Sequence, residues 1–166
     1  MTHPSIPAYL GPVLVRYLEP LDHSLFITLE RDAEVRKYIN GPSERSDEEF
    51  DTGLKSYLPT TSLLAVAHAS SNAFLGRCGL LPIRGTNEVE LFLLLSRSSQ
   101  RQGIGARVLT FLVGLAKSMG NEPVGIVHPD NAPSRALLGK VGMVLAGTSY
   151  TGYQAGHLRY LPRNAA

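Results

Sequence analysis

The sequence predicts an α+β fold, and three observations support this prediction. Helix-type segments cluster early in the chain, short apolar segments of strand type follow them, and a long amphipathic helix comes next. With 166 residues, of which 43% are apolar, the chain is large enough to bury one sizeable core. We therefore expect a single domain over residues 1–166.

The first third of the chain is predicted to hold one strand and three short helices. After a leader rich in proline, residues 12–18 (PVLVRYL) alternate between apolar and polar side chains, as a strand does. Asp22, Asp32 and Ser46 each stand where a helix cap is expected, and Ser46 with Glu49 has the spacing of a capping box. The expected helices span residues 23–29, 33–40 and 47–58.

The remaining two thirds are predicted to hold five strands and two helices. Three strand-type segments follow one another through short turns, which favours an antiparallel meander. The apolar positions of residues 106–117 have helical spacing, and Gly120 is placed to end that helix. Residues 130–142 begin with capping side chains and a proline, which is typical of a short helix. The expected strands are residues 62–69, 73–83, 89–95, 124–128 and 157–161.

Charge, cysteine content and apolar run length exclude several classes of protein. The 16 basic and 14 acidic residues are too nearly balanced for a general nucleic-acid binder, and the single cysteine, Cys78, allows no intrachain disulfide or cysteine zinc site. The longest apolar run, residues 91–95, is far shorter than the roughly 20 residues that span a bilayer, and the N-terminus lacks a signal pattern. The histidines lack metal-site spacing. We expect a cytoplasmic protein without metal that binds neither nucleic acid nor membrane, in an oligomeric state that stays open.

The hexapeptide QRQGIG (Gln100–Gly105) separates a strand-type segment from a helix-type segment. The first backbone N–H groups of a helix lack intrahelical partners, and together with the helix dipole they attract phosphate, which glycines allow to come close. A phosphate-loop NTPase would need Gly-Lys followed by Ser or Thr, and a dinucleotide-binding turn would need a third glycine at Val108. The hexapeptide alone therefore predicts either an anion-binding turn or a turn that two glycines merely shape.

With its neighbours, this turn resembles the acyl-CoA pyrophosphate loop of the GNAT superfamily of N-acyltransferases. The pattern Gln100-x-x-Gly103-x-Gly105 follows a strand and opens a helix, and the stretches FLGRCGL, VELFLLL, VHPDNAPS and LLGKVGM agree in order and spacing. The segment LVRYLEPLDHSLFITLERDAEVRKYI resembles the ribosomal-protein alanine N-acetyltransferase (Rim-type) branch, so the resemblance covers about residues 11–161. It implies a mixed, mostly antiparallel central sheet whose central strands splay apart. Gln102 and Met143 depart from the usual lysine and aromatic residue.

The resemblance implies acetyl-CoA as co-substrate and indicates how its phosphates would be held. Main-chain amides from about Arg101 to Ala106 would bind the pyrophosphate at the start of the helix. Arg97, Arg101 and Arg107 are the nearby cations that could meet the remaining phosphates.

The resemblance also implies where the pantetheine arm and the thioester would lie. The arm would pair with main chain of the strand that ends at Leu95, where an N–H would polarise the thioester carbonyl. Asn131 and Ser134 match the family's Asn-x-x-Ser element, although Asn131 fits a helix cap equally well. The expected cofactor-binding residues are Leu94, Leu95, Gln100, Arg101, Gln102, Gly103, Ile104, Gly105, Ala106, Asn131 and Ser134.

Amide formation from a thioester needs a neutral amine, a stabilised oxyanion and a proton for the departing thiolate. Glu90 shares a strand face with Phe92 and Leu94, and a carboxylate in such a cleft could accept the amine proton. Glu88 lies one alternation away and is equally compatible with the pattern. Ser134 is the candidate proton donor to the sulfur, and the rival donors are Tyr150, Tyr153 and Tyr160.

The remaining candidates concern the mechanism and the acceptor. Cys78 lies in a strand pattern, where a buried thiol acts as a small apolar residue, so we expect direct attack in a ternary complex. The acidic run 43–49 is expected to start a helix and could attract a cationic amine. The resemblance favours a peptide or protein N-terminus as acceptor. A polyamine, an aminoglycoside or an amino acid derivative would suit the same core, and a CoA-binding module without turnover would have the same turn.

Overall fold

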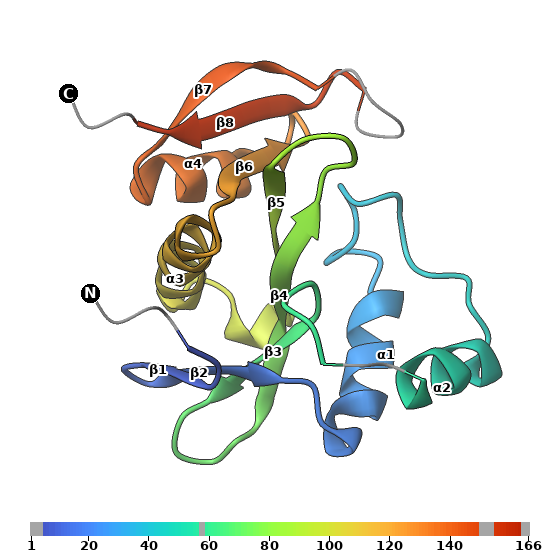
Figure 1. Ribbon diagram of the computed structural model, residues 1–166. Helices are drawn as coiled ribbons and strands as arrows, with labels where there is room; N and C mark the ends of the chain where they lie inside the picture. Colours follow the sequence, from blue (N-terminus) through green and yellow to red (C-terminus); the bar gives the residue numbers. More distant parts are fainter. Residues whose placement is uncertain (1–4, 57–58, 150–154, 164–166) are drawn as a thin grey trace.

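A computed structural model describes residues 5–56, 59–149 and 155–163 of the protein. Within these ranges the chain forms one eight-stranded sheet, in the order β1-β2-β3-β4-β5-β6-β8-β7, with four α-helices around it (Figure 1). The predicted α+β fold is confirmed. The strands are β1 (Ala8–Leu10), β2 (Val13–Tyr17), β3 (Leu64–His68), β4 (Phe74–Pro82), β5 (Glu88–Leu95), β6 (Glu122–Val127), β7 (Met143–Thr148) and β8 (Leu158–Pro162), and the helices are α1 (His23–Arg31), α2 (Asp47–Lys55), α3 (Ile104–Ser118) and α4 (Ala132–Lys140).

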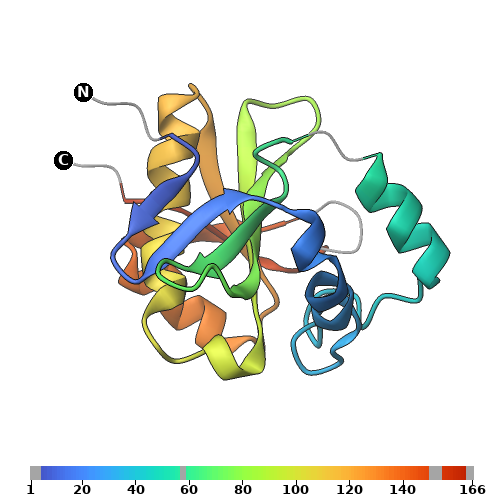
Figure 2. The same ribbon diagram turned by 90° about the horizontal axis from the view of Figure 1, so that it is seen from below.

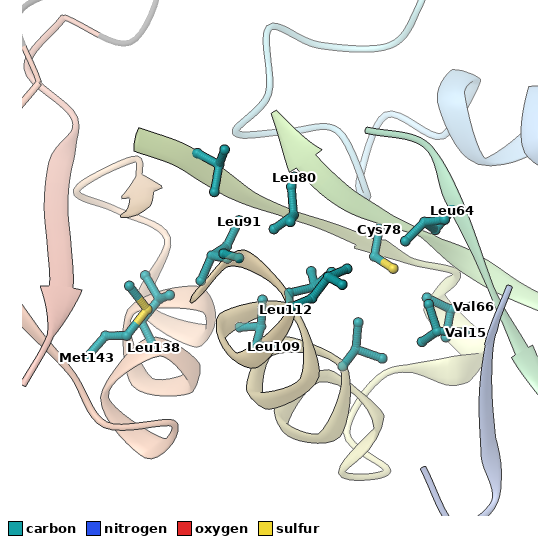
Figure 3. Packing of buried hydrophobic residues seen from close by; sticks show 14 of the residues in the cluster. Val15, Leu64, Val66, Cys78, Leu80, Leu91, Leu109, Leu112, Leu138 and Met143 are labelled. Carbon is teal, nitrogen blue, oxygen red and sulfur yellow. The ribbon is translucent and has the colours of Figure 1, made fainter. Parts of the chain in front are cut away.

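The helices lie on two sides of the sheet. Helices α3 and α4 cover one face, whereas α1 and α2 lie on the other (Figures 1 and 2). The main hydrophobic core lies between α3 and the sheet, where Leu109 and Leu112 of the helix face Leu80 and Leu91 (Figure 3). Because this core joins β2 through β6 with α3 and α4, the chain packs around one apolar centre.

Strand β5 is covered on both faces. Val89 and Leu91 belong to the main core, whereas Phe92 and Leu94 pack in a smaller cluster with Leu29 of α1. Successive side chains of a strand point to opposite faces, so Glu90 lies on the α1 face together with Phe92 and Leu94. The shared face expected from the sequence is therefore present.

The sheet changes character between β5 and β6. The strands from β1 to β5 form antiparallel pairs, as the predicted meander requires, but β5 and β6 are parallel. Their pairing ends at Glu90 and Val124. Beyond that point β5 continues beside β4 to Leu95, while β6 pairs with β8 from Gly125 to Val127. The two central strands are thus splayed, as expected.

Residues 33–40, expected to form a helix, instead form a series of turns. Asp32 caps this segment as expected, because its Oδ1 accepts hydrogen bonds from the backbone N–H groups of Glu34 and Val35. Asn40 and Gly41 follow with left-handed φ angles of 56° and 72°, which no helix continues through.

Two strands are absent from the sequence prediction. Strand β1 has only three residues and lies in the proline-rich leader. Strand β7 is interrupted by a register shift between Leu145 and Gly147, and Leu145 is 54% exposed, so its alternation is weak. Helix boundaries also differ from the prediction by a few residues, because α1 continues to Arg31, α2 ends at Lys55, α3 already begins at Ile104 and α4 ends at Lys140.

Candidate active site

The parting of β5 and β6 opens a cleft with two adjoining compartments. The outer compartment, of about 500 Å³, lies beside the turn that precedes α3. The inner compartment, of about 100 Å³, extends along Leu91 and Val127 to Glu90. The residues that line both compartments, which we call the junction, are Tyr38, Ile39, Leu93, Asn131, Ser134 and Leu137.

The turn before α3 presents backbone N–H groups to the outer compartment. Gly103 is the N-cap of α3 with a left-handed φ of 76°, and Arg101 is also left-handed, with a φ of 59°. The N–H groups of Ile104, Gly105 and Ala106 belong to the first turn, where an α-helix has no internal acceptors. The positive end of the helix dipole is therefore directed at this compartment, which makes it suitable for an anion.

The two glycines of the turn serve different purposes. A Cβ at Gly103 would meet no atom within 4 Å, so only its left-handed backbone requires glycine. A Cβ at Gly105 would lie 2.9 Å from Cδ2 of Leu137 and 3.5 Å from Cδ2 of Leu93. Gly105 therefore allows α3 to approach α4 and β5 closely. Neither of the two explanations offered for the hexapeptide excludes the other.

Side chains of the turn bond to the end of β5 and to the residues that follow this strand. The Nε2 of Gln100 donates a hydrogen bond to the carbonyl oxygen of Leu95 at 3.1 Å, and the Nε2 of Gln102 donates one to Ser98 O at 2.6 Å. Gln100, Leu94 and Leu95 line the outer compartment, as do Arg101, Gly103, Gly105 and Ala106. Gln102 is exposed outside the compartment, and the side chain of Ile104 is buried in the main core.

The three candidate cations are separated in space. Arg97 forms an ion pair with Asp32, with its Nε 3.1 Å from Oδ2. Arg107 reaches the turn between β1 and β2, where its Nη1 lies 3.5 Å from Leu10 O. Arg101 lines the outer compartment together with Lys140, a cation of α4 that the sequence analysis did not select. The sequence could have indicated Lys140, because it lies in the last turn of the helix that Asn131 begins.

The structure distinguishes the two carboxylates of β5. Glu88 forms an ion pair with Arg159 of β8, in which Arg159 Nη1 donates to Oε2 at 3.0 Å. Glu90 is half-buried and lines the inner compartment, at the last position where β5 and β6 pair. Of the two residues that the alternation left equivalent, only Glu90 therefore lies in the cleft.

Asn131 and Ser134 both lie at the junction. The Oδ1 of Asn131 accepts a hydrogen bond from the N–H of Ser134 at 3.2 Å, so Asn131 is the N-cap of α4. The cap uses the amide oxygen of Asn131 and the main chain of Ser134. The two interpretations of Asn131 are compatible, because a capping residue here also lines the cleft.

Three aromatic rings from distant parts of the chain meet in the inner compartment. The ring centroids of Tyr38 and His128 are 5.2 Å apart, and those of His128 and His157 are 5.1 Å apart in an edge-to-face arrangement. The Nδ1 of His128 accepts a hydrogen bond from Asp130 N–H at 3.1 Å, so the neutral ring carries its proton on Nε2. Sequence reasoning missed these rings, and only the position of His128 directly after β6 could have indicated them.

Tyr160, one of the rival proton donors, and Cys78 do not line the described cleft. Tyr160 is 7% exposed in the main core, and its hydroxyl accepts a hydrogen bond from Arg135 Nε at 3.4 Å. Tyr150 and Tyr153 lie outside the described residues. Cys78 is fully buried on the α3 side of the sheet, and this burial raises the pKa of its thiol. A thiolate nucleophile at Cys78 is therefore disfavoured.

Two features are absent from residues 5–56, 59–149 and 155–163. In these ranges no three His, Cys, Asp or Glu side chains are grouped as metal ligands. None of the helices described there combines the length and apolar character that crossing a membrane requires.

Comparison with known proteins agrees with this geometry. Residues 13–144 match the model of the acetyltransferase (GNAT) domain family. No curated protein sequence matches the chain significantly.

Solved structures share the fold at low identity. An acetyltransferase from Agrobacterium tumefaciens is 18% identical, with a TM-score of 0.75 and 94% of each chain covered. Spermidine N-acetyltransferase from Vibrio cholerae, in complex with CoA and spermine, is 14% identical, with a TM-score of 0.73 and coverage of 90% of this chain and 92% of that one. A candidate ribosomal-protein-serine acetyltransferase from Vibrio cholerae is 16% identical, with a TM-score of 0.68 and coverage of 98% and 100%. The predicted GNAT-like fold is confirmed.

Proposed function

The chain belongs to the acetyltransferase (GNAT) family, and on this premise we propose that it transfers an acetyl group from acetyl-CoA to a primary amine by direct attack in a ternary complex. Members of this family use acetyl-CoA as the acyl donor. The observation that carries the proposal is the arrangement of the cleft. A turn whose free backbone N–H groups suit an anion lies at its outer end, and Glu90 lies at its inner end.

The outer compartment is suited to the donor. The N–H groups from Gly103 to Ala106 would bind the pyrophosphate, and Arg101 and Lys140 would add charge-assisted bonds to its phosphates. From there the pantetheine arm would follow the unpaired edge of β5 past Leu94 to the junction. The thioester would then stand between the two compartments.

The inner compartment is suited to the acceptor. The amine nitrogen would attack the thioester carbonyl carbon while a main-chain N–H near the end of β5 stabilises the oxyanion. Glu90 would accept the proton that the amine loses, directly or through a water molecule. The C–S bond would then break, and Ser134 at the junction would supply a proton to the departing thiolate. The products are an N-acetylated amine and CoA.

The lining of the inner compartment favours a cationic amine. Its ionisable residues in the described part of the chain are Tyr38, Glu90, His128 and His157, and neither lysine nor arginine is among them. Aromatic faces and a carboxylate stabilise an ammonium group until it is deprotonated.

We infer a peptide or protein N-terminus as the preferred acceptor. The Rim-type segment before residue 40 and the ribosomal-protein-serine acetyltransferase candidate from Vibrio cholerae support this choice. The similarity to spermidine N-acetyltransferase supports a polyamine as the second candidate. An aminoglycoside or an amino acid derivative is also compatible as acceptor, because the same fold could bind it.

The test is a thiol-release assay with acetyl-CoA and a panel of amines. The panel contains peptides that begin with Ala or Ser, the same peptides with blocked N-termini, spermidine and an aminoglycoside. We expect turnover with free peptides and none with blocked ones. Binding of CoA without turnover on any amine would instead favour a CoA-binding module.

A further inference from the structure

The segment between α1 and α2, residues 32–43, forms a roof over the cleft, and we call it the roof segment. Its Val35 lines the outer compartment, while Tyr38 and Ile39 belong to the junction. The segment contains turns and no regular helix, so its main-chain bonds alone define its place weakly. Other contacts must fix its height above β5.

Apolar packing and polar contacts together hold this segment. Val35 and Ile39 pack against the cluster of Leu29, Phe92 and Leu94, Asp32 pairs with Arg97, and Arg36 makes three further polar contacts. The Nε of Arg36 donates a hydrogen bond to Gly41 O at 2.6 Å, and its Nη2 donates one to Ile39 O at 3.0 Å. Its Nη1 forms an ion pair with Glu30 at the end of α1, and Glu30 O also accepts a bond from Ser43 N–H at 2.7 Å. The planar guanidinium thus connects the residues before and after Tyr38 and joins both to the carboxylate of Glu30.

The same carboxylate connects the roof segment to the sheet. Glu30 is 5% exposed, and its second oxygen forms an ion pair with Arg77 of β4. The guanidinium of Arg77 lies over the ring of Phe92 on β5, 4.1 Å from its centroid. Phe92 lines the inner compartment two residues from Glu90. A continuous chain of contacts thus runs from the roof segment to the strand that carries the candidate base.

A gain in stability does not explain the ion pairs in this series of contacts. Burial lowers the pKa of Arg77, which means that desolvation opposes its charge, while Glu30 favours it. Buried ion pairs contribute little net stability, because desolvation offsets their attraction. Geometry is fixed on the Arg36 side, where hydrogen bonds accompany the ion pair, whereas Glu30 Oε1 and Arg77 Nε form an ion pair without a hydrogen bond. Here one buried carboxylate is shared by two guanidinium groups, and one of these also holds two carbonyls of the roof segment.

We propose that Glu30 and Arg36 are positioning residues, which hold Tyr38 at the junction and thereby set how tightly the acyl arm of the donor is bound. This inference rests on the proposed function. Tyr38 contacts the ring of His128 across the cleft, so a displaced roof segment would separate these rings and widen the junction. The nucleotide end of CoA, held by the turn before α3, would not respond.

The first test measures the roof segment without any ligand. Arg36→Lys keeps a positive charge beside Glu30 but cannot donate to both Ile39 O and Gly41 O. Amide hydrogen exchange of residues 33–43 should become about tenfold faster, while the midpoint of urea unfolding stays close to that of the original protein. The matched control is Arg31→Lys on α1, whose guanidinium bonds Arg45 O and Asp47 near α2 and should leave this exchange unchanged.

The second test measures binding of two probes. In Arg36→Lys the Kd of acetyl-CoA should rise about fivefold, whereas the Kd of 3′-phospho-ADP, which lacks the pantetheine arm, should stay constant. Tyr38→Leu should raise the Kd of acetyl-CoA to a similar degree. The Kd of the double variant should not exceed the higher of the two single-variant values, because both substitutions act through the same ring. A merely structural effect of Arg36 would add to that of Tyr38.

Unchanged exchange in Arg36→Lys, or additive losses in the double variant, would overturn the inference. If the unsubstituted protein bound neither acetyl-CoA nor the nucleotide, the proposed function would fail. The proposed positioning role would then be wrong as well, whereas faster exchange in Arg36→Lys would still show that Arg36 holds the roof segment.

Discussion

The outer and inner compartments are built in opposite ways. The outer compartment takes its binding groups mainly from one short turn, residues 100–106, whose backbone conformation fixes the direction of its N–H groups. The inner compartment takes Tyr38, Glu90, His128 and His157 from four separate segments, and each of these acts through its side chain. Backbone donors bind the part of a ligand that does not vary, whereas side chains can be replaced to suit another acceptor. The difference thus explains how one donor site can serve many acceptors.

Gly103→Glu should have the largest effect, and it tests the outer compartment. A carboxylate about 4 Å from a phosphate costs about 4 kcal/mol at an effective dielectric constant of about 20, which corresponds to a roughly thousandfold rise in the Kd of acetyl-CoA. The side chain has space, so the protein should fold, apart from the strain of a left-handed residue. Isothermal titration calorimetry gives the Kd.

Gly120→Glu is the matched control for that variant. Gly120 follows the other end of α3 with the same φ of 76° and the same open space within 4 Å. Both variants therefore carry the same backbone strain, and only Gly103→Glu places charge at the expected phosphate. Equal Kd values for the two variants would contradict the pyrophosphate site.

Glu90→Gln tests the inner compartment and should have the second largest effect. Loss of a general base lowers kcat/KM by about a hundredfold or more, and the acidic limb of its pH profile should disappear. The Kd of acetyl-CoA should not change, because Glu90 does not line the outer compartment. Initial rates over a range of pH values, with saturating donor, measure these quantities.

Glu88→Gln provides the comparison for Glu90. Glu88 lies one alternation away on the same strand but is paired with Arg159 outside both compartments. Its loss should reduce stability slightly and change kcat/KM by less than about threefold. A profile that kept its acidic limb in Glu90→Gln but lost it in Glu88→Gln would transfer the role to the other carboxylate.

The contrast between the compartments also explains how much the sequence predicts. The strand, turn and helix around QRQGIG are adjacent in the chain, so local spacing identifies them, and the splayed sheet follows from the resemblance. The choice between Glu88 and Glu90 depends on which of them lines the cleft, and segments that are distant in the chain build that cleft. The same applies to the rings of Tyr38, His128 and His157. Arg36 compensates for the missing helix at residues 33–40 through contacts that only tertiary structure reveals.

Arg101→Gln should have a smaller effect in the outer compartment. Arg101 is exposed, so a bond from it to a phosphate would be partly screened, and its loss should raise the Kd of acetyl-CoA about tenfold. The difference should shrink in high salt. Gln keeps the length of the side chain and the same strain at a φ of 59°. Arg107→Gln, which alters a cation directed at Leu10 O instead, should leave the Kd unchanged.

Gly105→Ala should have the smallest effect, although the residue lies in the same turn as Gly103. The added Cβ meets the flexible end of Leu137, which can shift by a few tenths of an ångström, and the higher helix propensity of alanine offsets about 1 kcal/mol of the resulting strain. We expect the free energy of urea unfolding to change by less than about 1 kcal/mol and the Kd of acetyl-CoA by less than about twofold. A much larger rise in Kd would mean that the phosphates approach Gly105 from the side of its missing Cβ. In that case the close packing of α3 against Leu137 would not be the reason for this glycine.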